Sequence, residues 1–578
     1  MQTLIVEILS HPVHVYSLKA DNIEVYQEKA LEEARDLFLE FYDEVYQNLM
    51  MKDFNPLWTP DTKSENDVDF KDDFWRVSYF FYNVSLIKLL QKEHRVKVVD
   101  RTTSPFDIQA YFYNFLKQEG IEFEKVHKPD RFINRNAIKK FVLNSIRNFP
   151  QNILSFGKEI KKRLTLKKSS IQNTHPDKKK IYLFVEPVGD IKYIDWRYKE
   201  LLQEHDEKRS EIIFVSTINF KGADEQKYKF INVNRLLSKP DLGRTILESF
   251  WAGLKVRMYK LSKRLKPGTS TEFKYFLKNV PTSFFYPVRE NIGFNNLFEK
   301  FGRGLLVIKG PVLNKSGAMQ IQNARKHGVH TSIVAARILT STRLSNQFVP
   351  SHFNQSFPRI YPDSMVIYDR LSFETIQKQA GEKITLHTMG NETFSYDEVK
   401  PVRSEVFKIT LALQKKKEIE TMVDTVVEAI EGMGNVVLNL KMHPSFPIPE
   451  KLMKRYRQIP FINIMPVQTS LDDTIRESDV CITSYSTASL EFVKKGKPTV
   501  WLKNVTLNSL FFADLQKNVG ICISDSGELK KLIKKMKDDP DYYSEESRKQ
   551  HAQINQILYH LDETSSLSEV IQMELEKV

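Results

Sequence analysis

Five serines and threonines fall within seven positions of one short stretch, between Thr483 and Ser489. They follow an apolar run, Val480 to Ile482, and a helical pattern begins after them at Leu490. Serine and threonine oxygens commonly cap the first N–H groups of a helix, but one or two residues are enough for that. Free N–H groups and a positive dipole end also suit an anion, and extra hydroxyls add hydrogen bonds to a phosphate. The stretch therefore predicts either a helix cap alone or a helix cap that also binds a phosphate.

A histidine lies at the end of another predicted strand. In "NVVLNLKMHP" (435–444), His443 follows the apolar run and Pro444 fixes the turn after it. Ligands of wound parallel sheets bind beyond the carboxyl ends of the strands, so His443 and Ser484–Thr487 should face one crevice from neighbouring loops. A histidine alone is more often structural. Its occurrence together with the hydroxyl cluster is what favours a ligand contact.

Strand-like and helical segments alternate along the chain, which predicts an α/β fold of wound parallel sheets. We expect two such halves, a domain at 1–395 with a basic helical insertion at about 127–178, and a domain at 396–578. In the first half, the expected strands lie at 4–9, 94–100, 121–126, 181–190, 211–217, 304–311 and 363–369, with one more after Gly328. In the second half, they lie at 406–414, 435–444, 460–466, 478–484 and 497–503.

Composition is that of an ordinary globular protein, with 41% hydrophobic and 28% charged residues among 578. The two cysteines, Cys481 and Cys522, lie in strand-like runs, which argues against a disulfide framework and favours a reducing cytoplasm. No cysteine and histidine cluster has metal-ligand spacing, so we expect neither a metal nor a cofactor. The first residues lack the features of a signal peptide, and no apolar run reaches about 18 residues.

The net charge of +13 is concentrated in stretches such as 157–168 and 251–268. The second stretch places four apolar residues, Trp251, Leu254, Met258 and Leu261, at helical spacing, with Lys255, Arg257, Lys260, Lys263 and Arg264 among them. Such a helix is expected either on an anionic membrane surface or as a solvated basic face whose apolar stripe faces the core. Nucleic acid is not an expected partner, because no recognisable binding motif accompanies the charge.

The motifs of the second half, in their order, resemble the donor-binding half of GT-B glycosyltransferases of bacterial surface polysaccharide. These motifs are a strand ending in "HP", an acidic helix, "SDVCITSYSTASLE" and "GKP". The likeness is to capsule Kdo transferases, bacterial sialyl- and polysialyltransferases, and CDP-glycerol glycerophosphotransferases. It covers about 400–530 by motif and the first half by architecture.

The resemblance implies two Rossmann-like domains that face a crevice, and metal-independent, inverting sugar transfer. The donor would be a nucleotide sugar, expected to be CMP-linked. The acceptor would be a surface polysaccharide or a lipid-linked glycan, at the cytoplasmic face of the cell membrane. In the sialyltransferase-like members the corresponding histidine and hydroxyls hold the nucleotide phosphate. This implies that His443, Ser486 and Thr487, with Ser484 nearby, bind phosphate, and that Glu491 binds the nucleotide ribose.

The chain departs from these families where the catalytic base is concerned. Ala335-Ala336-Arg337 replaces a "QHG" motif, and an acidic motif of several sialyltransferases is missing. Inverting transfer without a metal needs a carboxylate or an imidazole near the acceptor hydroxyl. Glu186 and Asp190, which follow a predicted buried strand, are the candidates by position, and Glu290 in "YPVRENIG" comes next.

Two other functions remain open. Transfer of a polyol phosphate from a CDP donor would use the same phosphate site. A catalytically inactive scaffold of a capsule assembly complex would explain the missing motifs. A nucleotide-sugar epimerase is less favoured, because such enzymes are compact and need no basic N-terminal region.

Overall fold

A computed structural model gives the structure of the chain. It describes residues 3–8, 13–16, 69–100, 107–125, 178–184, 199–204, 210–217, 229–266, 268–280, 285–310, 315–335, 361–390, 405–413, 419–443, 447–484, 488–503, 513–559 and 564–578, with Ser486 and scattered positions between 26 and 44. These residues form three β-sheets and the helices around them.

The first sheet is small and has the order β2-β1-β3-β4. Its strands are β1 (Thr3–Ile8), β2 (Val13–Tyr16), β3 (Arg95–Asp100) and β4 (Glu122–Lys125). Only β2 runs antiparallel to its neighbour; β1, β3 and β4 are parallel. Helices α2 (Asp69–Gln91) and α3 (Asp107–Gln118) connect the parallel strands and pack on α8 (Thr271–Asn279).

The second sheet has seven parallel strands in the order β11-β10-β9-β8-β5-β6-β7. They are β5 (Lys179–Phe184), β6 (Ser210–Ser216), β7 (Phe230–Asn232), β8 (Gly304–Gly310), β9 (His330–Ala335), β10 (Ser364–Ile367) and β11 (Thr385–Thr388). Counted from β5, the first six strands follow the order 3-2-1-4-5-6 of the Rossmann fold.

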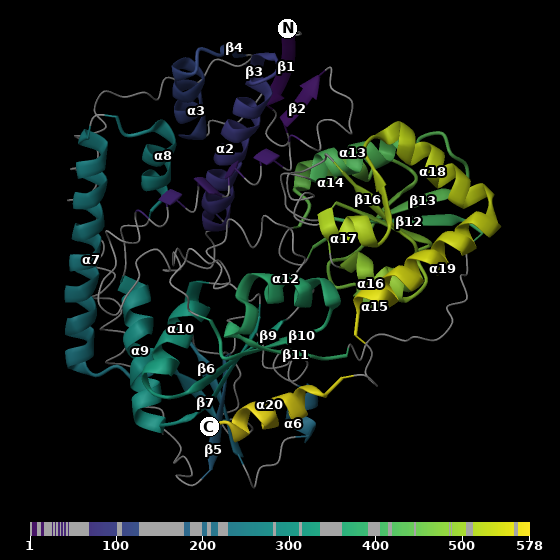
Figure 1. Cartoon of the computed structure of the whole chain (residues 1–578). Coiled ribbons are helices and arrows are strands. Elements are labelled where there is room, and N and C mark those ends of the chain that lie inside the picture. Colours follow the sequence, from purple (N-terminus) through teal and green to yellow (C-terminus); the bar gives the residue numbers. More distant parts are fainter. Residues whose placement is uncertain are drawn as a thin grey trace.

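The third sheet has six parallel strands in the order β14-β13-β12-β15-β16-β17, which is again 3-2-1-4-5-6. They are β12 (Phe407–Ala412), β13 (Val436–Lys441), β14 (Ile462–Ile464), β15 (Val480–Thr483), β16 (Thr499–Leu502) and β17 (Ile521–Ile523). The helices of this lobe, grouped on the right of Figure 1, are α13 (Ile419–Ile430), α14 (Glu450–Tyr456), α15 (Leu471–Arg476), α16 (Ala488–Lys494), α17 (Ala513–Asn518), α18 (Ser526–Asp538) and α19 (Pro540–Ile557).

The expected α/β architecture of two wound parallel sheets is confirmed by these strand orders. Each expected strand is present, and β2, β7, β11 and β17 are additional. The strands expected at 4–9, 94–100 and 121–126 belong to the separate first sheet. The expected insertion at 127–178 lies almost wholly outside the described residues, as does most of the segment around the expected division at 395.

Helices cover both faces of the seven-stranded sheet. On one face, α9 (Phe285–Phe301) and α10 (Lys315–Lys326) lie next to each other. The long helix α7 (Lys239–Leu265) packs on the outer side of α9. On the other face lie α6 (Lys199–Glu204) and the last helix of the chain, α20 (Leu567–Glu576). Leu567, Val570 and Ile571 of α20 are buried in one cluster with side chains of β5, β6, β8, β9 and β10.

The chain therefore returns from the C-terminal lobe to the seven-stranded sheet. After α19, Leu558 forms a β-bridge with Asp369, and the Tyr559 N–H donates to the Tyr368 carbonyl at 3.2 Å. The Arg370 guanidinium, at the start of α12 (Arg370–Ala380), lies over the Tyr559 ring at 5.2 Å. This junction connects the two lobes a second time.

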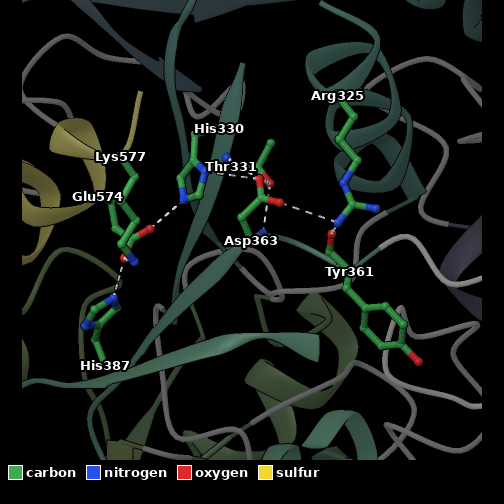
Figure 2. A network of polar contacts seen from close by, with 8 residues as sticks. All are labelled: Arg325, His330, Thr331, Tyr361, Asp363, His387, Glu574 and Lys577. Carbon is green, nitrogen blue, oxygen red and sulfur yellow. Dashed lines mark hydrogen bonds and ion pairs between the residues drawn. The ribbon is translucent and has the colours of Figure 1, made fainter. Parts of the chain in front are cut away.

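A buried carboxylate secures α20 (Figure 2). Glu574 has no exposed side-chain surface, and accepts hydrogen bonds from His330 Nε2 at 2.5 Å and His387 Nε2 at 2.6 Å. Lys577 Nζ lies 2.5 Å from the same carboxylate. These hydrogen bonds hold the pKa of Glu574 well below its usual range, against the effect of burial, which raises it. His330 also faces Asp363, at 3.7 Å.

We expect Glu574→Gln to lower the free energy of unfolding at pH 7 by about 1.5–3 kcal/mol, because charge-assisted hydrogen bonds are lost. A carboxyl with a depressed pKa stabilises the fold above its unfolded pKa and loses this effect as the pH falls. The difference between variant and wild type should therefore shrink on acidification below about pH 4. Denaturant unfolding monitored at several pH values measures this, with the exposed Glu576→Gln as control.

Candidate functional site

The hydroxyl stretch lies at the point where the strand order of the third sheet reverses. β12 pairs with β13 on one side and with β15 on the other, so the connections after β12 and β15 turn in opposite directions. Ser484 and Ser486 follow β15, and His443 follows β13. At about 4.8 Å between strands, β13 and β15 are about 10 Å apart. The structure thus brings His443 and the serines to one edge, at the position where such sheets bind ligands.

Most of the described hydroxyls here make hydrogen bonds within the protein. Thr483 donates to the Ala412 carbonyl at 3.2 Å, Ser484 to the Leu502 carbonyl at 3.1 Å, and Ser489 to the Ser486 carbonyl at 2.6 Å. These three hydroxyl hydrogens fix the turn between β15 and α16.

Ser486 differs from its neighbours. Its Oγ accepts a hydrogen bond from the Ala488 N–H at 3.2 Å, which confirms the predicted helix cap. Among the described residues, no acceptor is within reach of its hydroxyl hydrogen. Ser486 is 8% exposed, so it caps the helix and can still donate to an anion at this edge.

The other predicted donor-side residues have varied environments. His443 is half-buried directly after β13. Glu491 forms an ion pair with the buried Lys494 at 2.9 Å. Thr487 lies outside the described residues. The sequence analysis missed Gln516 of α17, whose buried Nε2 donates to the Ser484 carbonyl at 2.9 Å and so holds the turn in place; no motif around it signals this role.

The predicted bases Glu186 and Asp190 lie outside the described residues, but Glu290 is described. Tyr182 contacts Phe298 at 5.4 Å between ring centroids, and Phe184 contacts Phe294 at 5.9 Å. Helix α9 therefore runs antiparallel to β5. Glu290 is one turn before Phe294, so it lies beyond Phe184, the last residue of the strand.

Burial raises the pKa of Glu290 to about 7, despite the opposing charge of the neighbouring Arg289. Glu290 is thus a polar group at the carboxyl edge of the seven-stranded sheet, as His443 and Ser486 are at the carboxyl edge of the six-stranded sheet. A carboxyl that titrates near neutrality can accept a proton during a reaction.

No family model matches the chain, and no curated protein matches it. A UDP-GlcNAc 2-epimerase from Neisseria meningitidis, bound to UDP-GlcNAc, covers 69% of this chain and 100% of its own at 11% identity and a TM-score of 0.41. A putative UDP-N-acetylglucosamine 2-epimerase from Listeria monocytogenes covers 65% and 92% at 14% identity and a TM-score of 0.39.

The glycosyltransferase of kitacinnamycin covers 70% of this chain and 100% of its own at 10% identity, with a TM-score of 0.38. Since these TM-scores lie below 0.5, the fold assignment rests on the strand orders and registers of the two sheets.

The pH dependence of the stability of Glu290→Gln tests whether the Glu290 carboxyl titrates near neutral pH. A group whose folded pKa is raised from 4.5 to about 7 binds more protons in the folded state, so it destabilises the fold as the pH rises through this range. We expect Glu290→Gln to be more stable than wild type at pH 8, by up to about 3 kcal/mol, and equally stable near pH 4.5. Equal stability at pH 8 would contradict the raised pKa. Glu299→Gln, exposed on the same helix, is the control.

Proposed function

We propose that the chain is a GT-B glycosyltransferase that moves a sugar from a nucleotide donor to a glycan acceptor. The observation that carries this is that His443 and Ser486 follow β13 and β15 at the carboxyl edge of a Rossmann-order sheet, next to its reversal point. The finer assignment, a CMP-linked donor and a bacterial surface polysaccharide or lipid-linked acceptor, is supported by the motif resemblance of residues 400–530.

The donor phosphate would lie between the loops after β13 and β15. The Ser486 hydroxyl donates to a phosphate oxygen, and a ring N–H of His443 provides a second donor. Thr487 and Glu491 are the further proposed contacts, to the phosphate and to the ribose. Such donors stabilise the charge that develops on the departing nucleotide.

Transfer with inversion needs a base on the opposite side of the sugar. The acceptor oxygen attacks the anomeric carbon, the nucleotide leaves with its phosphate, and the acceptor proton goes to a carboxylate. By position in the sequence, the candidates for this base are Glu186 and Asp190, which come after β5, and Glu290.

Nucleotide binding tests the donor site. His443→Ala and Ser486→Ala should each raise the Kd for the preferred nucleotide by about 10- to 100-fold, since each removes a charge-assisted hydrogen bond. Ser484→Ala is the matched control: its hydroxyl is used on Leu502, so we expect lower stability and an affinity close to wild type. Thermal shifts with CMP, CDP, UDP and GDP identify the nucleotide.

Unchanged affinity in both His443→Ala and Ser486→Ala would contradict the phosphate site. Preference for CDP together with transfer of a polyol phosphate would favour the phosphotransferase alternative. Absence of binding to any of the four nucleotides would favour the inactive scaffold.

Helix α7 supports a membrane surface as a second partner. Of the nine large hydrophobic side chains that are exposed among the described residues, seven lie on α7. Leu247, Trp251, Leu254, Met258, Leu261 and Leu265 recur every three or four residues, so they share one face of the helix. Trp251 is 52% exposed and Met258 59%, so the alternative of a core-facing stripe is wrong.

The inner side of α7 contains Ala252 and Val256, which are buried, and Lys260, which donates to the Val280 carbonyl. The outer stripe is accompanied by the exposed Lys255 and Lys266, and residues 251–268 contain no aspartate or glutamate. This combination of apolar and basic groups is complementary to an anionic lipid surface. Among the described residues, no helix is both long enough and apolar enough to cross a membrane.

We therefore propose that the protein is peripheral on the cytoplasmic face of the cell membrane. It should sediment with vesicles of phosphatidylglycerol and phosphatidylcholine at low salt, and dissociate as ionic strength rises. The triple variant Trp251→Gln, Met258→Gln, Leu261→Gln should lose this binding without loss of stability. Met573→Gln, an exposed apolar residue of α20, is the control. Equal sedimentation with neutral and anionic vesicles would contradict the proposal. So would a wild-type dimer that is lost in the triple variant.

A further inference from the structure

The reversal point of the seven-stranded sheet lies between β5 and β8, which pair directly. Ligands of wound parallel sheets bind at this position, so polar side chains near it are candidates for ligand contacts, as they are in the six-stranded sheet. Three buried polar side chains lie on elements near the carboxyl edge of this sheet: Asn234 on η2, Glu290 on α9 and Gln320 on α10.

Gln320 is placed by the packing of α10 on α9. Asn323 Nδ2 donates to Asn291 Oδ1 at 2.8 Å, and His327 Nε2 lies 3.0 Å from Asn295 Oδ1. The two helices are therefore parallel, and Gln320 lies one turn closer than Asn323 to the carboxyl edge of the sheet. Its side chain is fully buried, and neither amide atom has a hydrogen-bond partner among the described residues.

Asn234 lies in the short helix η2 (Val233–Arg235), directly after β7. Its Nδ2 donates to the Thr217 carbonyl, just past the end of β6, while its buried Oδ1 has no hydrogen-bond partner in the described part of the chain. Helix α9 packs closely against η2, since a Cβ added at Gly293 would lie 2.8 Å from the Val233 carbonyl oxygen. Glu290 is one turn before Gly293 on this helix.

Buried polar atoms without partners are rare, because their desolvation is not offset by a hydrogen bond. Asn234 and Gln320 carry such atoms at the same edge of the sheet as the buried Glu290 carboxyl, where a bound molecule would satisfy them. Amide groups both donate to and accept from hydroxyls, which are the polar groups of a sugar.

We propose that this edge is the acceptor subsite, in which Asn234 and Gln320 bind hydroxyls of a polyhydroxylated acceptor and Glu290 is the catalytic base. The inference rests on the proposed glycosyl transfer and deepens it. The acceptor O–H bond breaks and its proton passes to the Glu290 carboxylate. The acceptor oxygen forms a bond to the anomeric carbon, and the bond from that carbon to the phosphate oxygen breaks, its electron pair leaving with the nucleotide.

The environment of Glu290 suits this role. It is 8% exposed, and Arg289 is the described charged group whose field acts on it. At neutral pH, a carboxyl with such a pKa is partly ionised and can accept a proton. It also binds that proton more strongly than a carboxylate of ordinary pKa.

The experiment compares Glu290→Gln with Glu299→Gln, using the donor whose nucleotide gives the largest thermal shift. We expect Glu290→Gln to lower the kcat of transfer by about 10²- to 10⁴-fold while the nucleotide Kd stays within twofold. The wild-type rate should fall as the pH drops below about 7, and Glu290→Asp should retain part of the rate with this dependence. Full transfer by Glu290→Gln with an unchanged pH profile would overturn the assignment, and Glu186→Gln and Asp190→Asn would then identify the base.

Acceptor binding is measured separately, by saturation-transfer NMR with methyl glucosides and methyl galactosides as probes. Gln320→Met and Asn234→Leu should weaken binding of a probe at least tenfold without changing the nucleotide Kd. Probe binding that is unchanged in both variants would overturn the subsite. A wild-type protein that binds a probe through Gln320 but transfers no sugar would overturn the proposed function and leave the subsite standing.

Discussion

The reversal of strand order in each parallel sheet is the constraint on which the functional geometry depends. Parallel strands require crossover connections, and where consecutive crossovers leave neighbouring strands in opposite directions, no helix covers the carboxyl ends between them. This happens between β12 and β15 and again between β5 and β8. Ser486 and His443 lie near the first point, and Glu290 near the second. One topological feature, used twice, thus provides the positions of the two proposed sites.

The return of the chain to the seven-stranded sheet connects the two lobes at both ends of the C-terminal lobe. Helix α20 contributes apolar side chains to the core of the first lobe, and the Glu574 carboxylate is held by two histidines from separate strands, β9 and β11. The bridge between Asp369 and Leu558 lies just before this helix. The C-terminal lobe is thus tied to the seven-stranded sheet at both of its ends along the chain.

The sequence predicted the sheets well because buried parallel strands are continuous apolar runs, as in "IYLFVEPVGD" and "NVVLNLKMHP". It missed β2, β7, β11 and β17, which have only three or four residues each and too little pattern to detect. At the site, it named His443 and Ser486 from strand ends, but no local signal connects Gln516 with the serine turn or Gln320 with Glu290. Those relations depend on helix packing between distant segments, which periodicity does not encode.

Three of the buried carboxyls show how environment separates structural from reactive groups. Glu574 accepts from two histidines and Lys577, and its pKa is held low. Burial raises the pKa of Asp369 to about 6, but its oxygens accept from the Ser372 N–H and hydroxyl, so it serves as the cap of α12. For Glu290, burial is the main influence and no such donor acts among the described residues, so its pKa is raised to about 7. A buried carboxyl that titrates near neutrality, on a helix packed against elements that carry Asn234 Oδ1 and the Gln320 amide without partners among the described residues, is the reason for proposing a ligand at this edge.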